Sequence, residues 1–234
     1  MLPLLMVSGL GADERLLAPQ SQAFANLRVA AWIEPEPRET LAHYAKRLAQ
    51  ANDPGGPCFV GGVSLGGMMA LEMIRHLDAR ACLLISTIHH RRELPRRVRV
   101  VAPLAPLLAG AAVHVNARLV RLVLRLRAKR LSPVKRSILE QLAESCPHFC
   151  TWAIRALLRW SPEPFPPNVP IVHLHGDCDP ILPHRYTHPD VLVPDGGHVL
   201  TLTHAEIVNG FLRSAMERLG PREPPSAPTC PRFR

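Results

Sequence analysis

The pentapeptide Gly-Val-Ser-Leu-Gly at residues 62–66 constrains the fold of this 234-residue chain more than any other feature. An apolar run, 58–61, precedes it, and a helix-compatible run, 67–74, follows it. A strand that passes directly into a helix through a serine needs small residues on either side, because the turn brings two backbone segments close together. Such a turn exposes the Ser64 hydroxyl at the carboxyl end of the strand. It also places the Leu65 N–H at the start of a helix, where the helix dipole can stabilise an oxyanion.

The surrounding chain alternates short apolar runs with helix-like stretches, which is the pattern of strand and crossover-helix units in a parallel sheet. Helices are expected at 13–25, 40–51 and 65–78, with Thr40 capping the second. A capping box from Thr203 to Glu206 opens a last helix that ends near Leu219. The pattern predicts an α/β fold with a mostly parallel sheet of about six strands flanked by helices. The expected strands are residues 2–8, 27–33, 58–63, 81–87, 170–175 and 191–193.

One long stretch, 88–168, interrupts this alternation. Loops of more than about 15 residues without structure are uncommon in compact domains, so the stretch is interpreted as a helical cap inserted at one edge of the sheet. The chain then divides into a core (1–87 and 169–219), the cap insertion and a Pro-rich tail at 220–234 that is expected to be disordered. The expected cap helices are residues 98–108, 117–130, 132–143 and 151–160.

The net positive charge of the chain comes from this cap. The net charge is +9, but residues 91–136 hold thirteen Lys or Arg against the single acid Glu93, which leaves −3 for the rest. Such a segment suits anionic lipid or a negatively charged substrate group, so peripheral contact with an anionic membrane is one expectation, although a solvated basic face is the simpler interpretation. No nucleic-acid motif accompanies the charge, and no nucleic-acid partner is expected. The arginines of the second expected cap helix include Arg118, Arg121, Arg125 and Arg127. Their spacings of three, four and two residues allow most of these four to share one helix face.

Composition and the start of the chain favour a cytoplasmic protein. Hydrophobic residues make up 47% and charged residues 20%, which excludes a disordered, collagen-like or coiled-coil chain. No run approaches the roughly 18 consecutive apolar residues of a membrane span. The apolar start at 2–7 has no Lys or Arg before it, unlike a signal peptide. The six cysteines lack the spacing of a disulfide framework and are expected to be reduced.

Two segments downstream can supply what a serine nucleophile needs, a base and a group that orients the base. Asp177 and Asp179 follow the fifth expected strand, and His198 follows the sixth on a Gly-containing loop. Because the carboxyl ends of parallel strands meet at one edge of a sheet, these side chains are expected to converge with Ser64. Their positions in the sequence do not decide whether Asp177 or Asp179 orients the base.

Two further clusters have weaker claims to a role. His89 and His90 follow the fourth expected strand and can line the mouth of a pocket or form a surface turn. Cys146, His148 and Cys150 are metal-ligand types, but one short loop without a second cluster is poor evidence for zinc. No metal site is therefore predicted.

The serine turn and the order Ser, Asp, His resemble the α/β-hydrolase superfamily, in particular its small serine esterase-like members. The resemblance covers residues 2–88 and 170–219. It implies Ser64 as the nucleophile, Asp179 rather than Asp177 as the acid, and His198 as the base.

The same resemblance implies that an oxyanion loop follows the first strand. This chain reads Ser-Gly-Leu-Gly-Ala-Asp there, at residues 8–13, where the family usually has His-Gly. The N–H of Leu10 is then the second oxyanion donor beside that of Leu65. Because the His is missing, the bracing of this loop departs from the family pattern.

The expected function is that of a serine hydrolase that cleaves a carboxylic ester or thioester through an acyl-enzyme intermediate, without a cofactor. The expected partner is a small acyl substrate, and the apolar composition of the cap favours an apolar one. Other acyl hydrolase activities, such as lactonase or amidase, and a binding protein with slow or no turnover remain as alternatives. The oligomeric state is left open.

Overall fold

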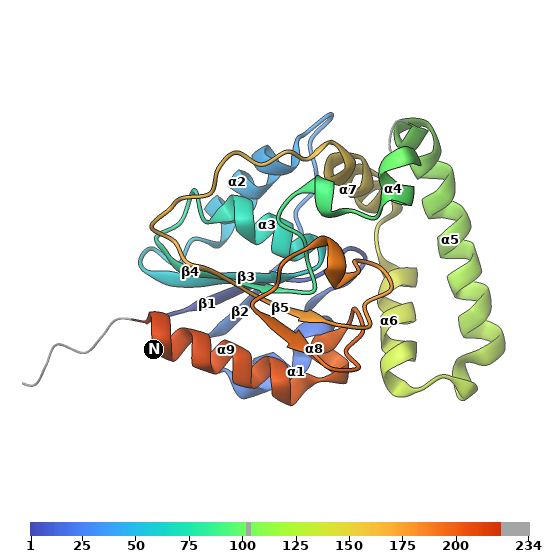
Figure 1. Ribbon diagram of the computed structural model, residues 1–234. Helices are drawn as coiled ribbons and strands as arrows, with labels where there is room; N and C mark the ends of the chain where they lie inside the picture. Colours follow the sequence, from blue (N-terminus) through green and yellow to red (C-terminus); the bar gives the residue numbers. More distant parts are fainter. Residues whose placement is uncertain (102–103, 221–234) are drawn as a thin grey trace, which may run out of the picture.

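The computed structural model describes residues 1–101 and 104–220, and its centre is a six-stranded sheet (Figure 1). The strand order is β2-β1-β3-β4-β5-β6, and every pair of neighbours is parallel. All six predicted strands are present, so the predicted fold class is confirmed. Strands β1 and β2 are shorter than expected, β4 and β5 are shifted by two residues and by one residue, and β3 and β6 have the expected bounds. Their bounds are β1 Leu4–Val7, β2 Leu27–Ala30, β3 Cys58–Val63, β4 Ala79–Ile85, β5 Ile171–Gly176 and β6 Val191–Val193.

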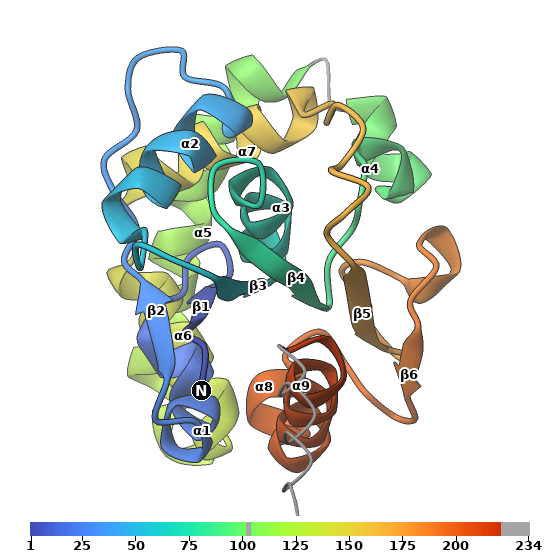
Figure 2. The same ribbon diagram turned by 90° about the vertical axis from the view of Figure 1, so that its left-hand side faces the viewer.

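Helices cover both faces of the sheet (Figure 2). One face carries α2 (Leu41–Asn52) and α3 (Leu65–Met73), and the other carries α1 (Ala18–Ala23), α8 (Leu200–Thr203) and α9 (Ala205–Leu219). Side chains alternate between the two faces of a strand, so β1 sends Leu5 and Val7 into one apolar cluster, and Leu4 and Met6 into the other. The sheet is thus buried on both sides, and its carboxyl edge is left for polar side chains.

Most predicted helices are found, with two local differences. Thr40 caps α2 as expected, its hydroxyl accepting the His43 N–H at 3.2 Å. The stretch expected as one helix at 13–25 instead opens as a 3-10 turn, η1 (Glu14–Leu17), before α1. The side chain of Asp13 caps this turn by accepting the Arg15 N–H at 2.9 Å.

The predicted capping box at Thr203 is wrong. Thr203 is the last residue of α8, where its hydroxyl donates to the Val199 carbonyl at 2.9 Å, one turn back in the chain. A side chain committed to the preceding turn cannot cap the next helix. The residue before α9 is His204, whose side chain makes no capping hydrogen bond.

The segment between β4 and β5 is helical, as expected, but its divisions differ. The helices expected at 98–108 and 117–130 are replaced by a short α4 and by one 23-residue helix, α5, which runs through Gly110 because an interior glycine weakens a helix by only about 1 kcal/mol. Helix α7 begins earlier than expected, with Pro147 in its first turn. The bounds are η2 Arg91–Glu93, α4 Arg96–Val101, α5 Ala105–Arg127, η4 Ala128–Arg130, α6 Pro133–Glu144, α7 Pro147–Arg159 and, after β5, η5 His184–Tyr186.

These helices stand at the carboxyl edge of the sheet (Figure 1). We call residues 88–168 the cap segment. Within it α6 lies next to the sheet edge and α5 lies farthest out, packed on α6 and α7. None of the described helices is long and apolar enough to cross a lipid bilayer. Of the tail predicted to be disordered, 220–234, all but Gly220 lies outside the described residues.

Candidate active site

The turn between β3 and α3 has the strained geometry that its sequence predicts. Ser64 has φ 55° and ψ −120°, a conformation that L-residues rarely adopt. A Cβ at Gly62 would overlap the Gly66 carbonyl, and one at Gly66 would overlap the carbonyls of Val7 and Ser8. The two glycines are therefore required for the close approach of β1, β3 and α3, which holds Ser64 at the sheet edge.

Ser64, His198 and Asp179 form one hydrogen-bonded chain. His198 Nε2 lies 3.0 Å from Ser64 Oγ, and His198 Nδ1 lies 2.7 Å from Asp179 Oδ2. A carboxylate can only accept, so the Nδ1 proton faces Asp179 and Nε2 is left to accept the proton of the Ser64 hydroxyl. The three side chains come from the loops after β3, β5 and β6, and the structure brings them together as the sequence predicts.

Asp179 is the carboxylate of this hydrogen-bonded chain, and its surroundings favour the ionised form. Its Oδ1 accepts the N–H groups of Ile181 and Leu182 at 2.8 and 2.9 Å, and its Oδ2 also lies 3.2 Å from His175 Nε2. Burial raises the pKa of Asp179, but the hydrogen bonds from His175 and His198 outweigh it and lower this pKa below its usual range. Asp177, the other candidate, is exposed and does not take part in the chain.

Leu65 and the loop that contains Leu10, the two expected oxyanion donors, both lie beside Ser64. The first-turn N–H groups of a helix have no partner inside the helix, which leaves that of Leu65 directed out of α3 beside Ser64. The loop after β1 lies against the same serine, because a Cβ built on Gly9 would be 3.7 Å from Ser64 Cβ. Leu10 follows Gly9 in this loop.

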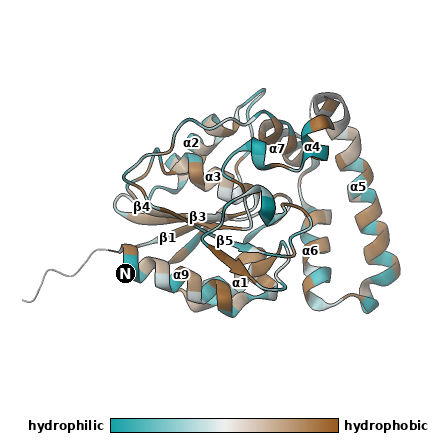
Figure 3. Ribbon diagram, viewed as in Figure 1, coloured by the Kyte–Doolittle hydropathy of each residue, from teal (hydrophilic) through white to brown (hydrophobic). Residues whose placement is uncertain are grey.

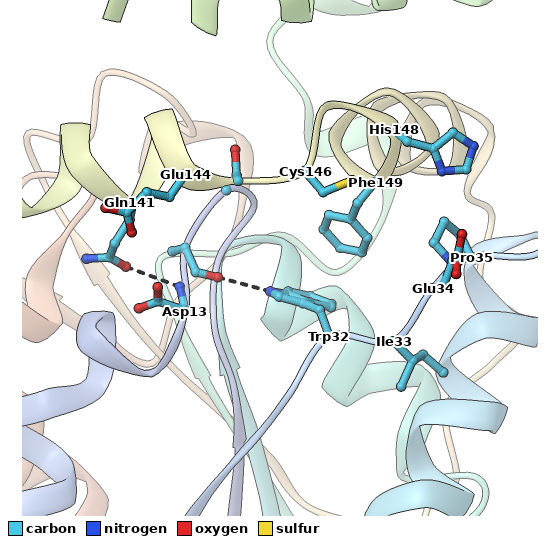
Figure 4. A pocket seen from close by; sticks show the side chains of 13 residues that line it. Asp13, Trp32, Ile33, Glu34, Pro35, Gln141, Glu144, Cys146, His148 and Phe149 are labelled. Atoms are coloured by element: carbon cyan, nitrogen blue, oxygen red, sulfur yellow. Dashed lines mark hydrogen bonds between the residues drawn. The ribbon is translucent and has the colours of Figure 1, made fainter. Parts of the chain in front are cut away.

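The loop after β1 is braced without the family histidine. Its Ala12 carbonyl accepts the Ser8 hydroxyl at 2.9 Å and the Trp32 Nε1–H at 3.1 Å, and Gln141 Oε1 accepts the Asp13 N–H at 3.2 Å (Figure 4). Neither Trp32 nor Gln141 was predicted from the sequence. Trp32 follows β2 at the same sheet edge, which is a usable signal, whereas nothing in the sequence links Gln141 on α6 to this loop.

A cavity of about 250 Å³ opens at Ser64 and His198. Its floor is the sheet edge and the loop after β1, and its roof is α6 of the cap segment. His89 and His90 are not among its lining residues; instead His89 packs edge-on against the buried His173. Apart from Ser64, His198 and Gln141 the lining is apolar or glycine: Gly9, Leu10, Gly11, Ala12, Leu16, Val63, Ile138, Leu142, Ile181 and Val199.

A second cavity, of about 570 Å³, is also lined by the loop after β1 (Figure 4). It shares Gly11, Ala12 and Gln141 with the first cavity, so the two cavities adjoin. Its wall is formed by the chain after β2 and by the junction of α6 and α7. The labelled side chains are Asp13, Trp32, Ile33, Glu34, Pro35, Gln141, Glu144, Cys146, His148 and Phe149.

One group of metal-ligand types occurs among the described residues, and its members are ion-paired around the buried Glu39. Glu36, Glu39 and His43 bring their ligand atoms within 4.8 Å of one another, and none of them lines the Ser64 cavity. Arg47 already pairs with Glu36 at 3.3 Å and with Glu39 at 2.9 Å, and His43 Nδ1 contacts Glu39 at 2.7 Å. All three residues therefore already have partners within the protein.

The sequence matches the Alpha/beta hydrolase family over residues 6–210, so this chain belongs to that family. Similar solved structures include a thermophilic esterase from Thermogutta terrifontis, 18% identical over 94% of this chain and 90% of the esterase, with a TM-score of 0.66. A hydrolase from Pseudomonas aeruginosa PA01 is 18% identical over 94% and 91% of the two chains, with a TM-score of 0.67.

An enol-lactonase from Burkholderia xenovorans LB400 has the same fold, at 16% identity over 93% and 92% of the two chains and a TM-score of 0.65. A comparison with curated proteins finds no match at the sequence level. At these identities the solved structures establish the shared fold. The chemistry of this chain therefore has to be argued from its own residues.

Proposed function

We propose that this protein is a serine hydrolase that cleaves carboxylic esters or thioesters with an apolar acyl group. The observation that carries the proposal is the unbroken chain from Ser64 Oγ to His198 (3.0 Å) to Asp179 (2.7 Å) beside a largely apolar cavity. A serine hydroxyl is a poor nucleophile unless an imidazole takes its proton, and this geometry supports that transfer.

In the first half-reaction Ser64 Oγ attacks the carbonyl carbon while His198 Nε2 takes the hydroxyl proton. Asp179 holds the imidazole in the required tautomer and stabilises the imidazolium. The carbonyl oxygen becomes an oxyanion, which the N–H groups of Leu10 and Leu65 bind. His198 then gives the proton to the leaving alcohol or thiol, and the acyl group remains on Ser64.

In the second half-reaction His198 takes a proton from water, whose oxygen attacks the acyl carbon. The proton returns to Ser64 Oγ as the carboxylic acid leaves. The substrate preference follows from the lining of the cavity. Leu16, Ile138, Leu142 and Val199 favour an apolar acyl chain, and the volume of about 250 Å³ restricts its length.

The test is intact-protein mass spectrometry after treatment with a fluorophosphonate probe. We expect one adduct on the wild type and none on Ser64→Ala. Ser86→Ala is the matched control, because Ser86 is another buried serine with positive φ at the sheet edge, but its hydroxyl has no hydrogen-bond partner among the described residues. This control should keep the adduct.

Turnover of p-nitrophenyl acetate, butyrate, octanoate and palmitate then sizes the cavity, with an optimum expected at butyrate or octanoate. Acyl thioesters, lactones and anilides of the preferred acyl group separate the ester and thioester proposal from lactonase and amidase activity. A folded wild type that forms no adduct would contradict the proposal and favour a binding protein on the same scaffold.

A further inference from the structure

Helix α5 is apolar on two opposite faces. Val113, Val120 and Leu124 lie on the face that packs against α6 and α7 and are buried or half-buried. On the opposite face a second apolar row recurs at spacings of four, three and four residues, which keeps its members in line along a helix. We call this row the outer stripe: Val115, Leu119, Leu122 and Leu126, which are 63, 56, 49 and 73% exposed.

An apolar row on the outside of a cap helix is unusual, because an amphipathic surface helix normally turns polar residues to water. Helix α5 is the outermost element at this end of the molecule (Figure 1), and hydrophobic residues recur along its outer side (Figure 3). Nothing among the described residues covers the stripe. The stripe therefore suits an external apolar phase or partner.

The charges beside the stripe identify which kind of partner fits it. Arg118 and Arg125 follow one border of the stripe, seven residues apart, and Arg127 lies on the other side near the end of the helix. All three are exposed, and Arg118 and Arg125 take part in no ion pair within the described part of the chain. The sequence contains no Asp or Glu between Glu93 and Glu140.

We propose that α5 binds the surface of an anionic lipid bilayer, with the outer stripe inserted among the acyl chains and its flanking arginines on the lipid phosphates. An interfacial helix needs an apolar face bordered by Lys or Arg, and α5 presents both on its solvent side. This inference concerns where the protein acts and does not depend on the hydrolase reaction.

Two other occupants fit the same surface less well. A second copy of the chain would bring Arg118 and Arg125 near the arginines of another α5, with no acidic residue on either helix to neutralise them. Nucleic acid would satisfy the arginines but would leave the outer stripe in water, because phosphate contacts carry that binding. The combination of an apolar row and unpaired arginines favours lipid.

Co-sedimentation with phosphatidylcholine vesicles and with vesicles of equal parts phosphatidylcholine and phosphatidylglycerol tests the proposal. We expect the wild type to pellet with the anionic vesicles, and its partition to fall at high salt. Each arginine near an anionic surface changes partition about fivefold, so Arg118→Gln with Arg125→Gln should weaken it about 30-fold. Leu119→Gln with Leu122→Gln should weaken it by at least about tenfold.

The matched control is Ile207→Gln with Arg218→Gln on α9, which removes one exposed apolar side chain and one exposed arginine from the other side of the molecule. This variant should partition like the wild type. All variants should keep the wild-type melting temperature and the wild-type hydrolysis of soluble p-nitrophenyl butyrate, because none of the changed residues lines the Ser64 cavity.

Four results would overturn the proposal. The first is a wild type that stays in the supernatant with anionic vesicles, and the second is equal partition of the wild type and both α5 variants. A dimer in light scattering that Leu119→Gln with Leu122→Gln converts to a monomer would assign the stripe to a second copy. Binding to single-stranded RNA that survives the leucine substitutions, without vesicle binding, would assign the arginines to nucleic acid.

Discussion

The carboxyl edge of the sheet and helix α5 place their side chains in opposite ways. At the sheet edge the carboxylate of Asp179 is fully buried, and both of its oxygens accept hydrogen bonds. On α5 the apolar side chains of Val115 and Leu126 are mostly in contact with solvent. A buried charge is tolerated only when every partner is in place, so the sheet edge is rigid by necessity. The outer stripe of α5 has no such constraint within the fold.

The largest effect expected at the sheet edge is the loss of activity in Asp179→Asn. An amide can donate to His198 Nδ1 and hold the wrong tautomer, so kcat for the preferred p-nitrophenyl ester should fall about 10⁴-fold. Steady-state kinetics measures this, and circular dichroism should show an unchanged fold. Asp177→Asn, two residues away and exposed, is the control and should retain wild-type kcat. If the two variants lost activity equally, the assignment of the acid would be wrong.

Replacement of a glycine by alanine should change the stability in opposite directions in the two regions. Gly66→Ala should destabilise the protein by about 2–3 kcal/mol, because its Cβ would overlap backbone carbonyls of β1 that cannot move aside. Gly110→Ala in α5 should stabilise by about 0.5–1 kcal/mol, because a Cβ there meets its nearest neighbour, Thr151 Cγ2, at 3.9 Å. Urea denaturation measures the change in the free energy of unfolding for each variant. If both substitutions stabilised or both destabilised the protein, the difference between the two regions would not hold.

The same contrast explains what the sequence could predict. The strands were predictable because they are short, continuous apolar runs, as expected for a parallel sheet that is buried on both faces. Ser64 and His198 were predictable because each follows such a strand. The choice of Asp179 over Asp177 needed the resemblance to the hydrolase family, because both acids follow the same strand.

The hydrogen bond from the Asp13 N–H to the Gln141 side chain was not predictable, because the two residues are 128 positions apart in the sequence. The single α5 was also missed, because the local pattern predicted separate helices at 98–108 and 117–130, whereas α5 runs through Gly110 and packs on α6 and α7.

Acid should destabilise the sheet edge through a second buried group. Burial lowers the pKa of His173 on β5 to about 2, with His89 and His175 adding a smaller effect. The folded state therefore keeps His173 neutral, while the unfolded chain takes up its proton below a pH of about 6.5. Above that pH the imidazole is neutral in both states, and His173 makes stability no more dependent on pH. Below it the unfolded chain binds the additional proton, and the free energy of unfolding falls by up to about 1.4 kcal/mol for each pH unit.

Urea denaturation between neutral pH and acid measures this slope. His173→Gln removes the proton uptake, so its stability should fall less steeply with acid than that of the wild type. The two proteins should differ by a constant amount at alkaline pH, where the imidazole is neutral in both states. Parallel curves over the whole range would mean that His173 takes up its proton in the folded state as well.

The smallest change in the free energy of unfolding is expected for a substitution in the outer stripe of α5. Leu119→Gln should change the free energy of unfolding by less than about 0.5 kcal/mol, because more than half of the side chain already faces solvent. Val120→Ala, at the next position but buried, should destabilise by about 1.5 kcal/mol for the two carbons removed. Urea denaturation of the two variants therefore separates the inner face of α5 from its outer stripe.

The two assays together separate binding from folding. If the replacement of Leu119 releases the protein from anionic vesicles without loss of stability, the side chain contributes to binding and not to the fold. If Leu119→Gln instead lost as much stability as Val120→Ala, the outer stripe would be packed against protein in solution. The proposal that this face of α5 binds lipid would then be wrong.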